Sequence, residues 1–317
     1  MLNTDDSNRN GHIDKLIEEG IANHRAGRLQ EASVAYEKIL RVKADHPDAL
    51  YLLGGVVYQM GNPQRAAELL SDAIESDPGR DYFYTHLGLA LQAMKRPEDA
   101  IDAFESAAAL NPDNAETYNS IGILLKKCGR HEKAVSAFRR AAELAPESAA
   151  AHNHLGSALL AVEKPGEALS AFKAAIKADP GKASYLNNLG KAFCILGRMR
   201  EAVDSFKKAI ELDQNFSAAY QNLGAALEAI GNSEEAAAAF EKTVSLAKDP
   251  AEARHNLGNY FLARGKTKEA IGEFKQAIDL RDDFAEAYNS LGIALKGEGR
   301  LEDAVEAYRK AIAINPN

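Results

Sequence analysis

Residues 115–148, AETYNSIGILLKKCGRHEKAVSAFRRAAELAPES, decide the fold of this chain. In their first half, Tyr118, Ile121, Gly122 and Leu125 recur at the spacing that places residues on one face of an α-helix. A glycine inside a helix costs about 1 kcal/mol relative to alanine. The glycine on this face therefore indicates a close approach to a second helix, where a side chain would not fit.

The second half of the same stretch predicts that second helix. Gly129 provides the turn, because glycine is the residue that most readily reverses the chain between periodic segments. After it, Ala134, Phe138, Ala141 and Leu144 again lie on one helical face. The small alanines leave room for the aromatic ring between them. The stretch is therefore predicted to form a hairpin of two helices.

The same pattern recurs along the whole chain in steps of 34 residues, without an insertion or deletion. The glycine of the first helix recurs as Gly20, Gly54, Gly88, Gly122, Gly156, Gly190, Gly224, Gly258 and Gly292. The large residue of the second helix recurs as Tyr36, Leu70, Phe104, Phe138, Phe172, Phe206, Phe240, Phe274 and Tyr308. Such a period is typical of repeat proteins in which each unit packs only on its neighbours.

The turn position is glycine in seven repeats and is Lys95 or Glu163 in the other two. We predict an all-α solenoid of nine helix pairs over residues 13–317, preceded by a disordered tail over residues 1–12. The repeats are predicted to start at residues 13, 47, 81, 115, 149, 183, 217, 251 and 285.

The pattern Tyr118-x-x-Ile121-Gly122, followed by Ala134, Phe138 and Pro146, resembles the tetratricopeptide repeat over residues 13–317. The resemblance implies antiparallel helix pairs stacked in a right-handed superhelix, with the first helices lining a concave groove. More narrowly, Tyr-x-x-Leu-Gly-x-x-Leu with interspersed Asn is similar to the repeats of O-linked N-acetylglucosamine transferases and of bacterial proteins that fuse such repeats to a transferase.

Composition favours an ordinary cytoplasmic protein. The formal net charge is −8, which argues against a nucleic-acid partner because phosphates are bound by positive surfaces. No apolar run approaches the length of a membrane span, and the polar N-terminus shows no secretory signal. Two cysteines, Cys128 and Cys194, are too few for a disulfide framework or a zinc ligand set.

Each first helix carries a second stripe that helix pairing leaves unused, and the resemblance places it in the groove. Amides in it can bond a peptide backbone whatever the peptide's sequence. Besides Gln221, we single out Asn119, Asn153, Asn187, Asn188, Asn222, Asn256 and Asn289. The resemblance to the transferases supports this role directly for Asn188, Asn222 and Asn256, whereas Asn119, Asn153, Asn187 and Asn289 lie one residue earlier in their repeats. The alternative is that these amides bond neighbouring repeats or face water.

Three lysines, Lys126, Lys127 and Lys191, are also predicted to project toward the groove. They favour acidic or phosphorylated peptides, although solvated lysines need no such role. The Lys and Arg clamp by which other tetratricopeptide proteins hold acidic C-terminal tails is absent from the corresponding positions.

No catalytic motif emerges, so we predict neither an enzyme nor a cofactor or metal site. His131-Glu132 lacks the second histidine of a zinc-protease helix. His152 and His154 point to different sides of a helix. Neither cysteine lies in a recognisable nucleophile setting.

The leading hypothesis is a scaffold that binds an extended peptide or partner segment in the groove. Two alternatives remain: a substrate-recruiting part of a larger transferase, and a scaffold that forms homo-oligomers through its C-terminal repeat. The last repeat has no following polar helix, and we expect it to expose apolar side chains, with Leu291, Leu295, Tyr308 and Ile312 as candidates.

Overall fold

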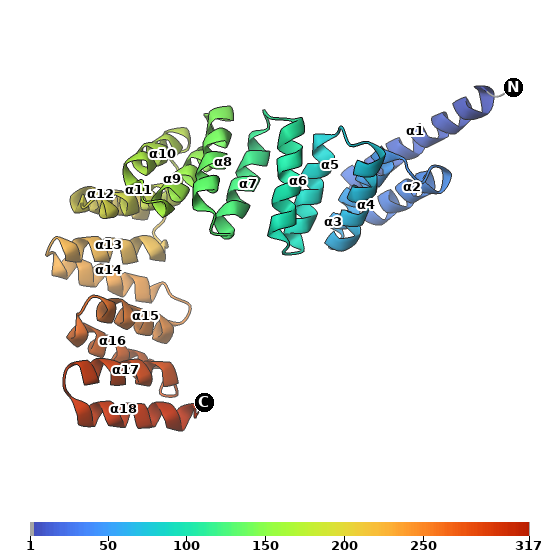
Figure 1. Ribbon diagram of the computed structural model, residues 1–317. Helices are drawn as coiled ribbons and strands as arrows, with labels where there is room; N and C mark the ends of the chain where they lie inside the picture. The colour runs from blue at the N-terminus through green and yellow to red at the C-terminus, as the bar shows by residue number, and fades with distance from the viewer. Residues whose placement is uncertain (1–2, 317) are drawn as a thin grey trace. The chain divides into compact units, whose positions relative to one another are not determined.

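The computed structural model describes residues 3–316, with side chains from residue 11 onward. In that range the chain forms eighteen α-helices and no strand (Figure 1). The first ten are α1 (Asn3–Arg25), α2 (Leu29–Val42), α3 (Pro47–Gln59), α4 (Pro63–Ser76), α5 (Asp81–Ala93), α6 (Pro97–Leu110), α7 (Ala115–Lys127), α8 (His131–Leu144), α9 (Ala149–Ala161) and α10 (Pro165–Ala178). The remainder are α11 (Ala183–Ile195), α12 (Met199–Leu212), α13 (Ser217–Ala229), α14 (Ser233–Ser245), α15 (Pro250–Ala263), α16 (Thr267–Leu280), α17 (Ala285–Gly297) and α18 (Leu301–Ile314).

The helices form two compact units, residues 1–178 and residues 179–317. Within each unit an odd-numbered helix packs on the even-numbered helix that follows it, and that helix packs on the first helix of the next pair. The short turns make the two helices of a pair antiparallel, as α17 and α18 show in Figure 1. The all-α fold of stacked helix pairs predicted from the sequence is confirmed.

The turns inside the pairs show why the sequence repeats glycine there. Seven of them place glycine at φ between 71° and 85°, the left-handed region that glycine enters without steric cost. Lys95 and Glu163 occupy the same position with φ of 58°. The turn geometry is therefore maintained in the two repeats that lack glycine, at the expense of some backbone strain.

Helix starts follow from the loop residues before them. The side-chain oxygen of Asn114 accepts hydrogen bonds from the backbone N–H groups of Glu116 and Thr117, at 3.1 and 3.2 Å. These groups have no partner inside the helix, so the cap stabilises the start of α7. Proline opens α3, α4, α6, α10 and α15, a position where its missing N–H is not needed.

The recurring glycine of the first helix packs on the aromatic ring of the second. A Cβ atom built on Gly122 would lie 2.6 Å from the Cε1 atom of Phe138, a distance that carbon atoms in contact do not reach. The ring is almost fully buried. Glycine at this position therefore allows the two helices of a pair to approach closely.

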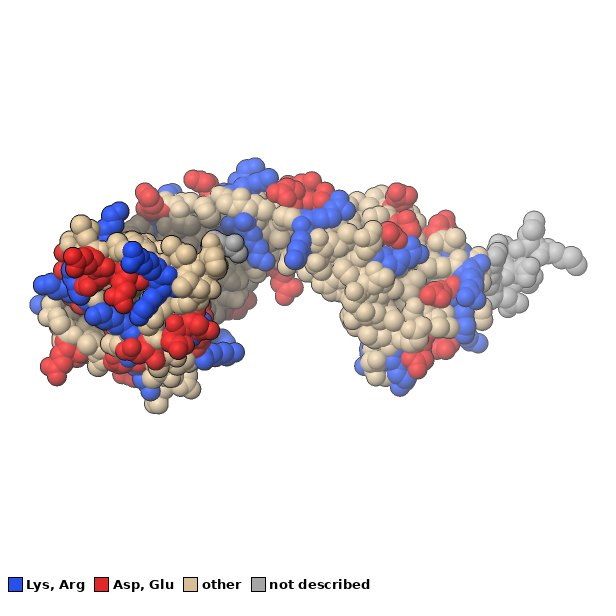
Figure 2. All heavy atoms as spheres, turned by 90° about the horizontal axis from the view of Figure 1, so that it is seen from below, with Lys and Arg blue, Asp and Glu red and all other residues tan. Residues whose placement is uncertain are grey.

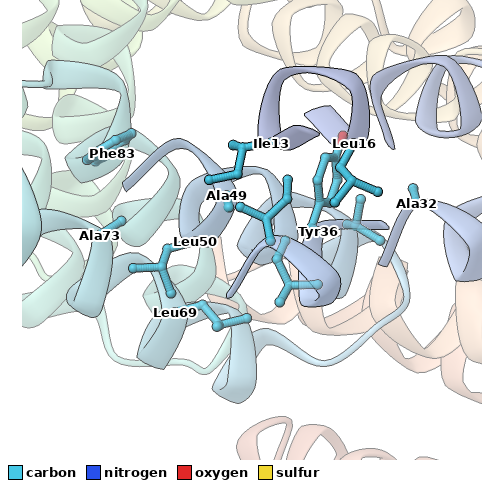
Figure 3. Close-up of a cluster of buried hydrophobic side chains, with 12 residues drawn as sticks. Ile13, Leu16, Ala32, Tyr36, Ala49, Leu50, Leu69, Ala73 and Phe83 are labelled. Atoms are coloured by element: carbon cyan, nitrogen blue, oxygen red, sulfur yellow. The ribbon is translucent and has the colours of Figure 1, made fainter. Parts of the chain in front are cut away.

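At the start of the chain, one hydrophobic cluster extends across successive helix pairs. In the first unit, Ile13 and Leu16 of α1 converge with Tyr36 of α2, while Leu50 of α3 and Phe83 of α5 extend the same cluster (Figure 3). Burial of such side chains is the main stabilising term of a solenoid, because each repeat alone is too small to form a core.

Two expectations about the ends differ from the structure. Helix α1 begins at Asn3, so residues 3–12 are helical where a disordered tail was expected, and residues 1–2 lie outside the described residues. In the last repeat, Leu291 and Leu295 are buried because α18 covers them, whereas Ile312 is exposed and Tyr308 is half-buried. A single solenoid over residues 13–317 stays a prediction.

Candidate functional site

The stripe singled out from the sequence lies on the first helices of the pairs. These helices carry Asn119, Lys126 and Lys127 on α7, Asn153 on α9, Asn187, Asn188 and Lys191 on α11, Asn222 on α13, Asn256 on α15 and Asn289 on α17. The stripe is thus built by α7 and α9 in the first unit and by α11, α13, α15 and α17 in the second.

Within each unit, polar side chains of this stripe link successive repeats. In four places the side chain of the fifth residue of one repeat, counted from the start of the repeat, bonds that of the sixth residue of the next repeat, 35 residues later. The four pairs and the distances between their polar atoms are Tyr51–His86 at 3.5 Å, Asn119–His154 at 2.7 Å, Asn187–Asn222 at 2.9 Å and His255–Ser290 at 3.0 Å. The stripe therefore carries a ladder of hydrogen bonds along each unit.

This ladder engages three of the predicted groove amides. Asn119 contacts the imidazole of His154, and the amide nitrogen of Asn222 donates to the side-chain oxygen of Asn187. Asn187 is buried, at 7% exposure. A buried amide needs a partner to offset its lost hydration. These bonds accordingly support the alternative in which such amides bond neighbouring repeats.

Other amides of the stripe are exposed. Asn256, Asn289 and Gln221 are all exposed, and no hydrogen bond links their side chains to the rest of the described chain. Asn153 and Asn188 are half-buried. An exposed amide keeps both its donors and its acceptor available to a ligand.

Two clefts of the second unit contain these exposed amides. One, of about 190 Å³, is lined by Gln221 and Asn256 together with Ser217, Thr243, Val244, Ala247, Ala253 and Leu257. The other, of about 370 Å³, is lined by Asn289 with Ala285, Glu286, Ser290, Ala311, Ile312 and Asn315. Each cleft combines amide groups with small apolar side chains, which suits a peptide backbone bearing a small side chain.

The lysines of the stripe are exposed. Lys126 and Lys127 belong to the first unit and Lys191 to the second, and all three side chains reach solvent. Burial lowers the pKa of His154, and the nearby charge of Lys126 lowers it further. On the face drawn in Figure 2, basic and acidic side chains alternate instead of forming an area of one sign.

The two histidines considered in the sequence have different partners, and the Cys194 thiol is half-buried. The Nε2 atom of His152 lies 2.8 Å from the carbonyl oxygen of Pro146, whereas His154 contacts Asn119. Burial raises the pKa of the Cys194 thiol. Among the described residues, no three potential ligands gather to hold a metal ion. In the same range, no helix is long and apolar enough to cross a membrane.

Sequence reasoning missed the partners in the ladder. None of Tyr51, His86, His154, His255 and Ser290 was predicted to be a binding residue of the stripe, although their polar atoms bond across repeats. The available signal was a spacing of 35 residues between two polar side chains. This spacing is one residue longer than the repeat. A comparison of equivalent positions in successive repeats therefore does not bring the two bonded residues together.

Comparison with known proteins identifies the family. Models of the tetratricopeptide repeat match residues 82–147, 119–183, 154–215, 205–238 and 255–317. The chain belongs to the tetratricopeptide repeat (TPR) family. Residues 25–107 match the model described as anaphase-promoting complex, cyclosome, subunit 3. No curated protein matches the chain.

Solved TPR structures resemble this TPR protein along parts of its length. The crystal structure of MamA protein has 28% identity and a TM-score of 0.50, covering 55% of this chain and 95% of MamA. YrrB, described as a TPR protein with an unusual peptide-binding site, has 23% identity and a TM-score of 0.52 over 60% of this chain and 98% of its own. A TPR protein from Parabacteroides merdae ATCC 43184 has 17% identity and a TM-score of 0.61, covering 78% of this chain and 98% of its own. The narrower resemblance to O-linked N-acetylglucosamine transferases stays a prediction.

Proposed function

We propose that this TPR protein is an interaction scaffold whose first-helix stripe binds an extended segment of a partner protein. The observation that carries the proposal is the division of the stripe into bonded and exposed amides. Asn187 and Asn222 bond each other, while Gln221, Asn256 and Asn289 are exposed beside clefts. The bonded amides set the spacing of successive repeats, and the exposed amides offer donors and acceptors to a ligand.

The exposed amides suit a peptide backbone because each offers one acceptor and two donors. Gln221, Asn256 and Asn289 come from three successive first helices, α13, α15 and α17. An extended chain exposes its own N–H and C=O groups at regular intervals and has no internal partners for them. Hydrogen bonds from three helices would fix its direction, and the clefts would receive its side chains. YrrB offers a precedent for peptide binding on this fold.

The lysines of the stripe add a charge preference to this proposal. Lys126 and Lys127 are exposed on the first unit and Lys191 on the second, and on each unit a flexible ammonium group attracts carboxylate or phosphate. We infer that acidic segments bind more tightly than basic ones, with an affinity that falls as salt is raised. A role in recruiting substrates for a transferase remains a prediction for the same surface.

The test begins with partners captured from the native source and mapped to a binding segment. Affinity for a labelled peptide is then compared between the wild type and the triple variant Gln221→Ala, Asn256→Ala and Asn289→Ala. Each net hydrogen bond contributes about 0.5–1.5 kcal/mol, so three predict a loss of affinity of at least about tenfold. The matched control replaces three exposed amides of second helices, Gln30→Ala, Gln64→Ala and Gln276→Ala. Equal affinity of the two triple variants for the peptide would exclude the exposed amides as its binding surface.

A further inference from the structure

The outer face of α18 exposes a continuous apolar stripe. Leu301 is 61% exposed, Val305 48% and Ile312 62%, with the half-buried Tyr308 between the last two. Their spacings of four, three and four residues place all four side chains on one face of the helix. Single exposed apolar residues need no explanation, but an aligned set of this kind is typical of an interaction surface.

The equivalent residues of earlier repeats are covered by a helix. Ile271, 34 residues before Val305, is 7% exposed, and Ile278, 34 residues before Ile312, packs in a cluster with Phe284 and Ala287. That cluster is formed where α17 packs on α16. The α18 face is therefore built to receive a helix that lies across it.

The first helix of a second copy does not fit this face. In α3 the third residue of the repeat is Ala49, which is fully buried. In α1 the equivalent residue is the exposed Lys15, and Glu18 and Glu19 of α1 are exposed as well. Docking α1 on the α18 face would bury these charges against Val305 and Ile312. Burying charges without partners is strongly unfavourable, so head-to-tail association is disfavoured.

The charges beside the apolar stripe favour α18 of a second copy instead. Glu302 and Arg309 are exposed and lie seven residues apart, on the same flank of the helix. Neither forms an ion pair with a described residue, in contrast to Arg300 with Asp303 and Lys310 with Glu306. In an antiparallel pair of helices related by a twofold axis, this flank of both copies lies on the same side of the seam, so Glu302 of one copy meets Arg309 of the other. In a parallel pair the two flanks lie on opposite sides of the seam, and these ion pairs cannot form.

We propose that two copies of this chain associate through α18, with the two helices antiparallel across a twofold axis. Leu301 of each copy then packs near Ile312 of the other, and Val305 packs near Tyr308. Two equivalent Glu302–Arg309 ion pairs flank this apolar seam. A twofold contact uses the same surface on both copies, so it closes at a dimer and does not continue into a filament.

Sedimentation equilibrium over a concentration series tests this surface through its charges. The wild type is expected to dimerise reversibly, and Glu302→Arg or Arg309→Glu alone to weaken the dimer at least about tenfold, because like charges then face each other. The double variant Glu302→Arg with Arg309→Glu restores the opposite-charge pairs and is expected to return to within about threefold of the wild type. Glu269→Arg, an exposed acidic residue on α16, is the control and leaves the dimer unchanged.

The apolar seam is tested separately. Ile312→Glu is expected to abolish dimerisation, while Leu280→Glu, at a similarly exposed leucine on α16, is expected to have no effect. Both variants keep their helical circular dichroism, because the replaced side chains are exposed. A wild type that remains monomeric up to about 1 mM overturns the proposal, and so does a dimer indifferent to Ile312→Glu. A dimer that the charge exchange fails to restore overturns the antiparallel arrangement.

Discussion

The Nδ1 atom of His154 lies 2.7 Å from the side-chain oxygen of Asn119, one repeat earlier in the chain. An amide oxygen can only accept a hydrogen bond, so Nδ1 donates and the proton of the neutral ring resides there. Burial lowers the pKa of His154, and the charge of Lys126 lowers it further. The bond between two first helices is thus donated by an imidazole whose charged form is disfavoured by burial and by Lys126.

The stability of the first unit should consequently fall in mild acid. In the unfolded chain His154 titrates near about 6.5, whereas in the folded protein it resists protonation. The unfolded state therefore binds the proton more readily, and stability present above the unfolded pKa is lost as the pH falls toward the lowered folded pKa. We expect His154→Gln to reduce the stability difference between about pH 7.5 and pH 5.5, measured by urea unfolding. An unchanged difference would contradict this assignment.

The contact between glycine and the aromatic ring predicts opposite outcomes for two similar substitutions. In Gly122→Ala the new Cβ meets the Phe138 ring at 2.6 Å, and overpacking of about 1–3 kcal/mol outweighs the helix propensity gained. In Gly55→Ala, inside α3, nothing lies within 4 Å of the new Cβ, so we expect stabilisation by up to about 1 kcal/mol. The free energy of unfolding of both variants is measured in urea. If Gly122→Ala is more stable than the wild type, the steric role of this glycine is refuted.

The bond between Asn187 and Asn222 predicts coupling in a double-mutant cycle. Asn222→Ala leaves the buried Asn187 side chain without its donor, at an expected loss of about 1–3 kcal/mol. Asn187→Ala removes the buried amide as well, so the double variant should lose less than the sum of the two single losses. The measurement is the free energy of unfolding of all four proteins. Additive losses would show that the two amides act independently.

The repeat architecture could be predicted from the sequence because its determinants lie within one 34-residue unit. Gly122 and Phe138 are separated by one helical hairpin, and their spacing is the same in every repeat, so local periodicity was sufficient to place them together. The turns at Lys95 and Glu163 were predicted correctly for the same reason. Their neighbours impose the geometry even where the residue disfavours it.

The division of the amides could not be predicted in this way. Whether an asparagine is bonded or exposed depends on the residue at the facing position of the next repeat, such as His154 opposite Asn119. Asn256 and Asn289 are the same residue type as the bonded amides and are nevertheless exposed. Comparing equivalent positions describes one repeat at a time, whereas the bonding of an amide depends on the contact between two repeats. The burial of Leu291 and Leu295 was missed for a different reason, because α18 of their own repeat covers them.

Arg254 joins three consecutive helices of the second unit. From α15, its Nη1 atom donates to Glu241 of α14 at 2.8 Å and to Glu273 of α16 at 2.9 Å. The Arg254 and Glu273 side chains are 12% and 15% exposed, whereas that of Glu241 is 60% exposed. Burial raises the pKa of Glu273, and the bond to Arg254 opposes that rise.

Removing this arginine should therefore cost far more than removing the outer carboxylate. Arg254→Met leaves the Glu273 charge without its partner, and we expect a loss of about 3 kcal/mol. Glu241→Gln breaks an exposed ion pair and should cost less than about 1 kcal/mol. In Arg254→Met the pKa of Glu273 rises further above its unfolded value, so the variant should regain stability relative to the wild type as the pH falls and the carboxyl is protonated. Adding Glu273→Gln to Arg254→Met should restore part of the loss at neutral pH. Urea unfolding of the wild type and these three variants tests this, and equal losses for Arg254→Met and Glu241→Gln would show that Glu273 does not depend on Arg254.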